Sequence, residues 1–294
     1  MPAWLPIVIG LVALAVLSGG WYFRRYQMTL PPAGIVNLRD VAVMLLGISL
    51  LPYLYLALPA AGAAMVFGAA VLGILYFTLE PVLRARWAVW AGSLLLVAGD
   101  ITLALAAGVA SAPFLLLNGA VLVLAVTGVS NLWAQSGMKA RDVAVLAGAL
   151  AVYDWVATVR LTVTEDLIGR LAGLPFVPLL AWHADAPARG LVGVGLGDLL
   201  LATLFTLVMR KAFGSAAGRL AAAVSLATIA VVLALLAAGA ITTAVPAMVF
   251  LGPLMVAQYL GWRRAWGQER TTGQYLQAEP LPGGVNAARG GDPD

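Results

Sequence analysis

Residues 220–239 read LAAAVSLATIAVVLALLAAG, a run of twenty residues without one charged side chain. A helix needs about 20 mostly apolar residues to cross a bilayer core that is roughly 30 Å thick. No water is available there for unpaired backbone N–H and C=O groups, so a helix that bonds them internally is the expected structure. The run therefore predicts a membrane-spanning helix.

Eight other runs of similar character occupy much of the chain. Of the 294 residues 62% are hydrophobic and only 10% are charged, too few charges for a surface that faces water on all sides. We predict an all-α membrane protein with nine transmembrane helices in a single domain, residues 1–267. The nine predicted spans are 3–23, 41–57, 61–79, 87–109, 114–133, 143–159, 191–209, 220–239 and 243–262.

Two connections are longer than the rest. Residues 160–190 contain the apolar stretch LPFVPLLAW, which is too short to cross a membrane and is expected at the membrane surface or as a short strand. Residues 268–294 are rich in Gly, Pro and polar side chains, which predicts a disordered tail.

Basic residues are distributed unevenly over the predicted connections. Cytoplasmic loops carry the excess of Lys and Arg, so the richer face is predicted to be cytoplasmic. The N-terminus is then outside and the C-terminus, with its tail, inside. The 14 basic residues of the richer face are Arg24, Arg25, Arg39, Arg84, Arg86, Lys139, Arg141, Arg210, Lys211, Arg219, Arg263, Arg264, Arg270 and Arg289; the other three are Arg160, Arg170 and Arg189.

Cysteine is absent and histidine occurs once, which excludes disulfides, thiol catalysis and Cys- or His-rich metal sites. We expect no metal and no other cofactor. The arginines are scattered through short connections rather than gathered on one face, so no nucleic-acid partner is expected.

Three of the 13 acidic residues fall inside predicted spans: Asp100, Asp154 and Asp198. A carboxylate at the centre of a spanning helix costs about 2.5 to 3.5 kcal/mol on insertion scales, so each is a functional candidate. The alternative is that each one bonds to a polar group of another span.

Two of these aspartates lie in recognisable motifs. Asp154 is in AVYDWVATVR (151–160) and Asp198 is in GVGLGDLLLA (193–202), which resemble the YD and GxGD motifs of presenilins and signal peptide peptidases. The triplet 246–248, Pro-Ala-Met, resembles that family's PAL motif, and Met for Leu keeps volume and apolarity. The motifs fall on predicted spans six, seven and nine, as in the family, and the resemblance covers about residues 150–260.

Chain direction independently predicts that the two aspartates meet. Asp154 lies about 8 Å before the end of span six and Asp198 about 10 Å after the start of span seven, at about 1.5 Å per residue. Both ends face the same connection, so antiparallel neighbours would hold the carboxylates at one depth.

The resemblance implies an intramembrane aspartyl protease with Asp154 and Asp198 as catalytic residues. Two close carboxylates share one proton, so one can activate water while the other protonates the peptide carbonyl. The implied substrates are transmembrane proteins or signal peptides, in a prokaryotic plasma membrane and without an obligatory partner subunit. The residues expected to bind substrate are Tyr153, Gly195, Gly197, Pro246, Ala247 and Met248.

Each of these residues also has a structural explanation. Gly195 and Gly197 either admit water and substrate or let helices touch, and Tyr153 either bonds beside the pair or makes an ordinary helix contact. Pro246 is expected to interrupt a helix turn and free a carbonyl such as that of Thr242, for substrate or as a plain kink. In the family the segment before span seven also pairs with substrate, a place that LPFVPLL (174–180) takes here.

Asp100 matches no motif. We expect it to make a structural hydrogen bond, with Asn118, Asn131 and Thr102 as candidate neighbours; a role in a substrate or ion path is the alternative.

Other functions compete with this interpretation. Prepilin peptidases also use GxGD, but they usually carry a basic residue soon after it, where this chain has DLLLATL. A transporter or channel could use three buried aspartates as a proton or cation path. An inactive scaffold would leave the buried aspartates without a purpose.

Overall fold

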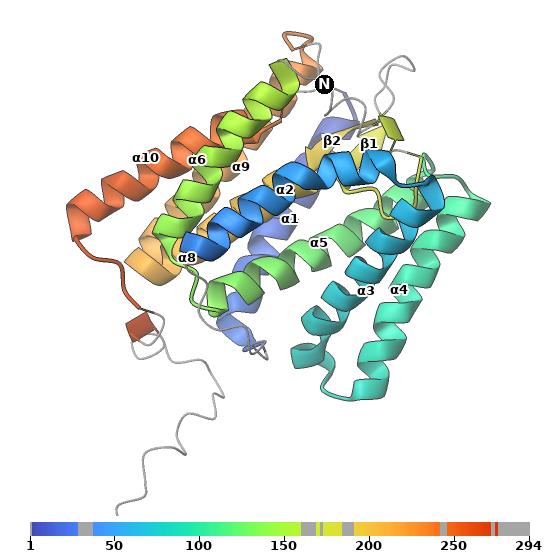
Figure 1. The fold of residues 1–294 in the computed structure, drawn as a ribbon, viewed down its shortest axis with the longest axis horizontal. Helices are drawn as coiled ribbons and strands as arrows, with labels where there is room; N and C mark the ends of the chain where they lie inside the picture. The colour runs from blue at the N-terminus through green and yellow to red at the C-terminus, as the bar shows by residue number, and fades with distance from the viewer. Residues whose placement is uncertain are drawn as a thin grey trace, which may run out of the picture.

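The computed structural model describes residues 2–28, 38–159, 169–170, 173–183, 191–241, 246–271 and 274–275, and it is mostly helical (Figure 1). Each predicted span contains one helix, which confirms the helical fold. The helices within these residues are α1 (Trp4–Arg25), α2 (Leu38–Ala57), α3 (Ala60–Leu83), α4 (Arg86–Ala106), α5 (Ala112–Gln135), α6 (Ala140–Val159), α8 (Leu196–Phe213), α9 (Ser215–Ala237) and α10 (Met248–Trp266).

Six helices of the described part are long and apolar enough to cross a membrane: α1, α2, α3, α4, α5 and α9. Large apolar side chains on them stay exposed in the isolated chain, such as Leu105 at 81% and Leu95 at 75%. Lipid rather than water suits such surfaces. These features fit a multi-pass membrane protein. The other three long helices, α6, α8 and α10, contain Asp154, Asp198 and the end of the Pro-Ala-Met triplet.

Helix α8 occupies the middle of the bundle. Most of its side chains are buried, and it contacts α1, α5, α6, α9 and α10. Helix α10 packs along α6, where a Cβ atom on Gly252 would lie 2.5 Å from the carbonyl oxygen of Ala147. Only glycine allows backbones to approach so closely. The helices that carry the predicted motifs are therefore direct neighbours.

The predicted seventh span was wrong over its first five residues. Leu191–Gly195 form strand β2, which pairs antiparallel with β1 (Leu179–His183), so the fold is not purely helical. Val192 and Val194 favour a strand, and a Cβ atom on Gly193 would lie 2.2 Å from the Leu180 carbonyl oxygen. The expectation of a short strand before span seven is confirmed for β1.

The connections of the bundle separate into two ends. The N-terminus and the β1–β2 hairpin lie at the upper end in Figure 1, and the α3–α4, α5–α6 and α8–α9 connections lie toward the opposite end. The basic pairs Arg24 and Arg25, and Arg210 and Lys211, stand in the last turns of α1 and α8. Basic residues thus gather at the end opposite the hairpin.

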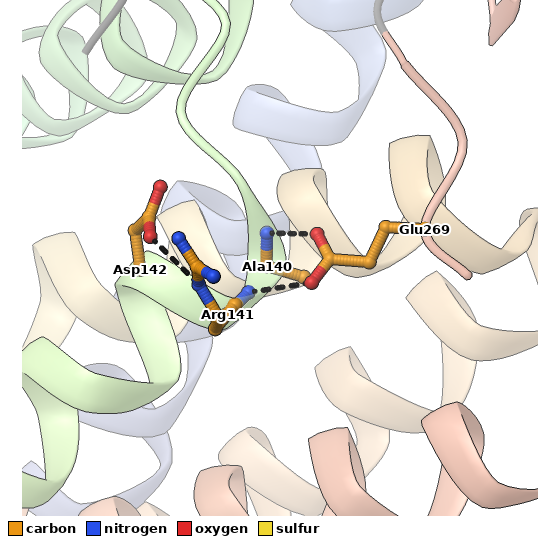
Figure 2. A network of polar contacts seen from close by, with 4 residues as sticks. All are labelled: Ala140, Arg141, Asp142 and Glu269. Atoms are coloured by element: carbon orange, nitrogen blue, oxygen red, sulfur yellow. Dashed lines mark hydrogen bonds and ion pairs between the residues drawn. The ribbon is translucent and has the colours of Figure 1, made fainter. Parts of the chain in front are cut away.

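A cluster of polar contacts, which we call the clamp, ties helix ends together there. The ammonium group of Lys211, which is 3% exposed, donates to the carbonyl oxygens of Ala134 and Met138 at 2.7 Å each. The carboxylate of Glu269 accepts hydrogen bonds from the N–H groups of Ala140 (3.0 Å) and Arg141 (3.2 Å), at the start of α6 (Figure 2). The Ala134 carbonyl and the two N–H groups are among those that a helix end leaves unpaired, and Met138 lies in the connection between α5 and α6.

The predicted tail begins too early at residue 268. Besides Glu269, the Arg270 N–H donates to the carbonyl oxygen of Ala212, and Tyr275 is buried with its ring centre 5.5 Å from that of Phe23. Residues 268–271 and 274–275 are therefore packed on the bundle, because they cap helix ends and bury an aromatic ring. Residues 276–294 lie outside the described part.

Candidate functional site

Asp198 lies in the first turn of α8, directly after β2. Its carboxylate accepts hydrogen bonds from the backbone N–H groups of Met248 (2.9 Å) and Ala247 (3.4 Å). These N–H groups belong to the start of α10, where no preceding carbonyl is available to accept them. The positive end of the α10 dipole also favours a negative charge at this point. The chain thus brings the Pro-Ala-Met triplet to Asp198 through backbone contacts.

Asp154 reaches the same place from α6. It lies near the C-terminal end of that helix, and its carboxyl group interacts electrostatically with that of Asp198. Both side chains are partly buried. The two aspartates therefore lie on neighbouring helices, one near the end of α6 and the other at the start of α8, and the chain reaches Asp198 through strand β2 rather than through two helical turns.

The role predicted for Pro246 in a helix turn is wrong. Helix α10 begins at Met248, so Pro246 precedes the helix and interrupts no turn of it. A proline suits this place because its missing N–H would find no helical partner there. Pro253 is the proline inside α10, and Thr242 lies outside the described residues.

The two motif glycines differ in their surroundings. Within the described part of the chain, a Cβ atom on Gly197 would meet no atom within 4 Å, and the residue is exposed, so no described helix packs against it. A Cβ atom on Gly195 would lie 3.4 Å from the Asp198 carboxylate. A side chain at Gly195 would therefore project beside the Asp198 carboxylate, and the open space at Gly197 agrees with an approach route for water or substrate.

Tyr153 makes a contact between helices. Its hydroxyl donates to the carbonyl oxygen of Ser49 in α2 at 3.3 Å. Met248 and Ala247 point their side chains into the buried core, so they meet Asp198 only through their N–H groups. Substrate binding by these three residues stays a prediction.

Asp100 makes its hydrogen bond to a different part of the chain from Asp198. It is fully buried and its carboxylate accepts a hydrogen bond from the N–H of Phe176 at 2.9 Å, which confirms the predicted structural bond. Asn118 donates to the next residue, Val177. Thr102 bonds within its own helix, and Asn131 bonds to α1 and to its own helix.

Sequence reasoning missed Gly193, Lys211 and Glu269. Gly193 belongs to the same glycine-rich run as the GxGD motif, and Lys211 is a cation in the last turn of a helix, which is a usual place for capping carbonyls. Glu269 had no local signal, because it caps a helix that begins 129 residues earlier in the chain.

The chemical groups of the site are two carboxylates and the backbone N–H groups of Ala247 and Met248. Within the part of the chain that the structure describes, no three His, Asp or Glu side chains gather in a way that could hold a metal ion. Compared with known proteins, the chain matches no family model and no curated protein. The resemblance to presenilins and signal peptide peptidases therefore rests on the motifs and their arrangement.

Proposed function

We propose that this protein is an intramembrane aspartyl protease that hydrolyses peptide bonds within or near transmembrane helices. The observation that carries the proposal is the convergence of Asp154 from α6 and Asp198 from α8 beside the start of α10. Two like-charged groups brought together inside a membrane bundle repel each other, so packing alone gives no reason for the arrangement. A catalytic pair does.

The chemistry needs only these carboxylates and water. One carboxylate takes a proton from a water molecule while the oxygen of that water attacks the carbonyl carbon of the peptide bond. The other carboxyl group protonates the carbonyl oxygen. The tetrahedral intermediate then breaks its C–N bond, and the leaving nitrogen receives a proton. Two products leave, one with a new carboxyl group and one with a new amine, and the pair again holds one proton.

The proposal includes nine crossings, with the N-terminus outside and the C-terminus in the cytoplasm. The six apolar helices and the gathering of basic residues away from the hairpin support it. The pair then lies nearer the outer face, as in signal peptide peptidases, so substrates with a cytoplasmic N-terminus are expected. Reporter fusions after Arg170 and at the C-terminus test this; a cytoplasmic signal at Arg170 with an external C-terminus would reverse the orientation.

The function is tested by incubating the purified protein with a membrane-helix peptide in detergent or liposomes. We expect two fragments that add up to the peptide plus one water, and we expect an aspartyl transition-state analogue to suppress them. A protein that cleaves no such peptide but conducts protons or cations through liposomes, with flux lost in Asp154→Asn, would instead be a transporter or channel.

A further inference from the structure

The segment before β1 is held by two buried polar side chains from different helices. Asp100 of α4 accepts the N–H of Phe176, and Asn118 of α5 donates its side-chain N–H to the carbonyl oxygen of Val177 at 3.0 Å. Asp100 is 0% exposed and Asn118 is 1% exposed. Consecutive residues of the segment are therefore fixed from two directions, and we call these two contacts the hairpin anchor.

Apolar packing reinforces the hairpin anchor. The ring of Phe176 packs with Val71, Leu75 and Val121, and a Cβ atom on Gly68 would lie 3.0 Å from it. Phe176 also adopts a φ of 59°, in the left-handed region that non-glycine residues rarely occupy. Such a conformation persists only where the surroundings hold it, and the hydrogen bond to Asp100 helps to do so.

A short path leads from the hairpin anchor to Asp198. The residue after Val177 is Pro178, whose carbonyl oxygen accepts the N–H of Leu196, the first residue of α8, at 2.9 Å. Leu179 then pairs with Gly195 in the β1–β2 hairpin. Asp198 follows Leu196 by two residues. The place of the hairpin and the place of Asp198 are thus set together.

We propose that Asp100 and Asn118 are positioning residues, which hold the β1–β2 hairpin at a fixed place relative to Asp154 and Asp198. This inference rests on the proposed protease function. Strand β2 ends three residues before Asp198, and a sheet edge can pair with an extended substrate segment. The anchor then decides which peptide bond of that segment meets the carboxylates.

The polar atoms of the hairpin anchor suggest a conservative replacement. One oxygen of Asp100 and the side-chain oxygen of Asn118 are buried without a hydrogen-bond partner among the described residues. Asn at position 100 keeps an acceptor for the Phe176 N–H and nearly the same side-chain shape. Asp100→Asn should therefore keep the anchor, whereas Asp100→Ala and Asn118→Leu should remove half of it each.

The first test follows the hairpin directly. The chain has no cysteine, so a spin label on His183→Cys, at the exposed end of β1, reports from one site. We expect Asp100→Ala and Asn118→Leu to increase label mobility and Asp100→Asn to leave it unchanged. The matched control is Thr102→Ala, an exposed residue of α4 that bonds within its own helix. Unchanged mobility in both anchor variants would overturn the inference.

The second test asks whether the hairpin anchor governs cleavage. With a membrane-helix peptide we expect Asp100→Ala and Asn118→Leu to lower kcat/KM by about 10- to 100-fold, largely through KM, and to spread cleavage over neighbouring bonds. Asp100→Asn should restore both KM and the single cleavage position, which fragment masses reveal. Cleavage by Asn118→Leu at the same single bond with unchanged KM would contradict the proposed role.

These tests separate the two proposals. If the wild-type protein cleaves nothing, the protease proposal fails and the part about cleavage position fails with it, while label mobility still decides whether the hairpin anchor exists. If Asp100→Ala does not fold, Asn118→Leu carries the test. Mobility and cleavage in Asn118→Leu that match Thr102→Ala then overturn the inference.

Discussion

Helices α6 and α8 are held differently at their two ends. At the clamp, Lys211 and Glu269 bind backbone groups at helix ends, and each buried or half-buried charge has partners. At the other end, Asp154 and Asp198 lie near enough for their charges to repel, and Asp198 binds only the start of α10 among the described hydrogen bonds. The clamp thus pairs each charge with backbone groups of opposite polarity, whereas the other end places two like charges near each other.

The difference teaches that stability and chemistry are separated along these helices. The clamp satisfies carbonyls and N–H groups that would otherwise be left unpaired at helix ends, so it should stabilise the bundle. The two carboxylates repel each other when both are charged, which a purely structural role does not require. Changes at the pair should therefore alter activity, and changes at the clamp should alter unfolding.

The largest expected effect comes from removing one carboxylate of the pair. Asp154→Asn should lower peptide cleavage on the order of 10³-fold or more, because the proton shared by the pair is lost. Its unfolding temperature should stay at or above that of the wild type, since a buried charge is removed. Fragment yield by mass spectrometry and unfolding in detergent measure both. Full cleavage by a folded Asp154→Asn protein would exclude the pair.

Removing the buried cation of the clamp should have the largest effect on stability. Lys211→Met leaves the carbonyl oxygens of Ala134 and Met138 without their donor, at a cost of about 1 to 3 kcal/mol. Unfolding by heat or denaturant measures it, with the exposed Lys139→Met as the matched control. Cleavage per folded molecule should persist; a stable Lys211→Met that has lost all cleavage would contradict the separation of the two ends.

Asp198 is expected to contribute to both catalysis and stability, because it also caps the start of α10. Asp198→Ala and Asp198→Asn should both be inactive, but Ala leaves two N–H groups without an acceptor whereas Asn retains one. Asp198→Ala should therefore be less stable than Asp198→Asn by about 1 kcal/mol, the usual value of a lost helix cap. Equal unfolding temperatures for the two variants would argue against the contact with α10.

The smallest expected effect is at Glu269. Glu269→Gln keeps an acceptor for the start of α6 but loses the charge that favours a helix N-terminus, at a cost of about 0.3 to 1 kcal/mol. Gln268→Ala, at the exposed neighbouring position, is the control. High salt should shrink the difference between Glu269→Gln and wild type. A difference that is insensitive to salt would point to a loss of packing instead.

The sequence could predict the helices because apolar runs of spanning length have few other structures available to them. The placement of Asp154 and Asp198 at adjoining ends of α6 and α8 was predictable from chain direction alone. Strand β2 was not, because LVGVG continues the apolar run of α8 and only the approach of β1 to Gly193 distinguishes it. The cap by Glu269 depends on where the chain returns after α10, which no local pattern encodes.

The most direct test of the shared-proton pair is the dependence of kcat/KM on pH for a membrane-helix peptide. A pair that works with one ionised and one protonated carboxyl group predicts activity that rises and then falls with pH. The rising and falling parts of this pH profile each report a proton shared by the pair, so neither is assigned to one aspartate. A bell-shaped profile in the wild type that Asp100→Asn preserves is the predicted result. A profile that stays flat from acidic to neutral pH would contradict catalysis by Asp154 and Asp198.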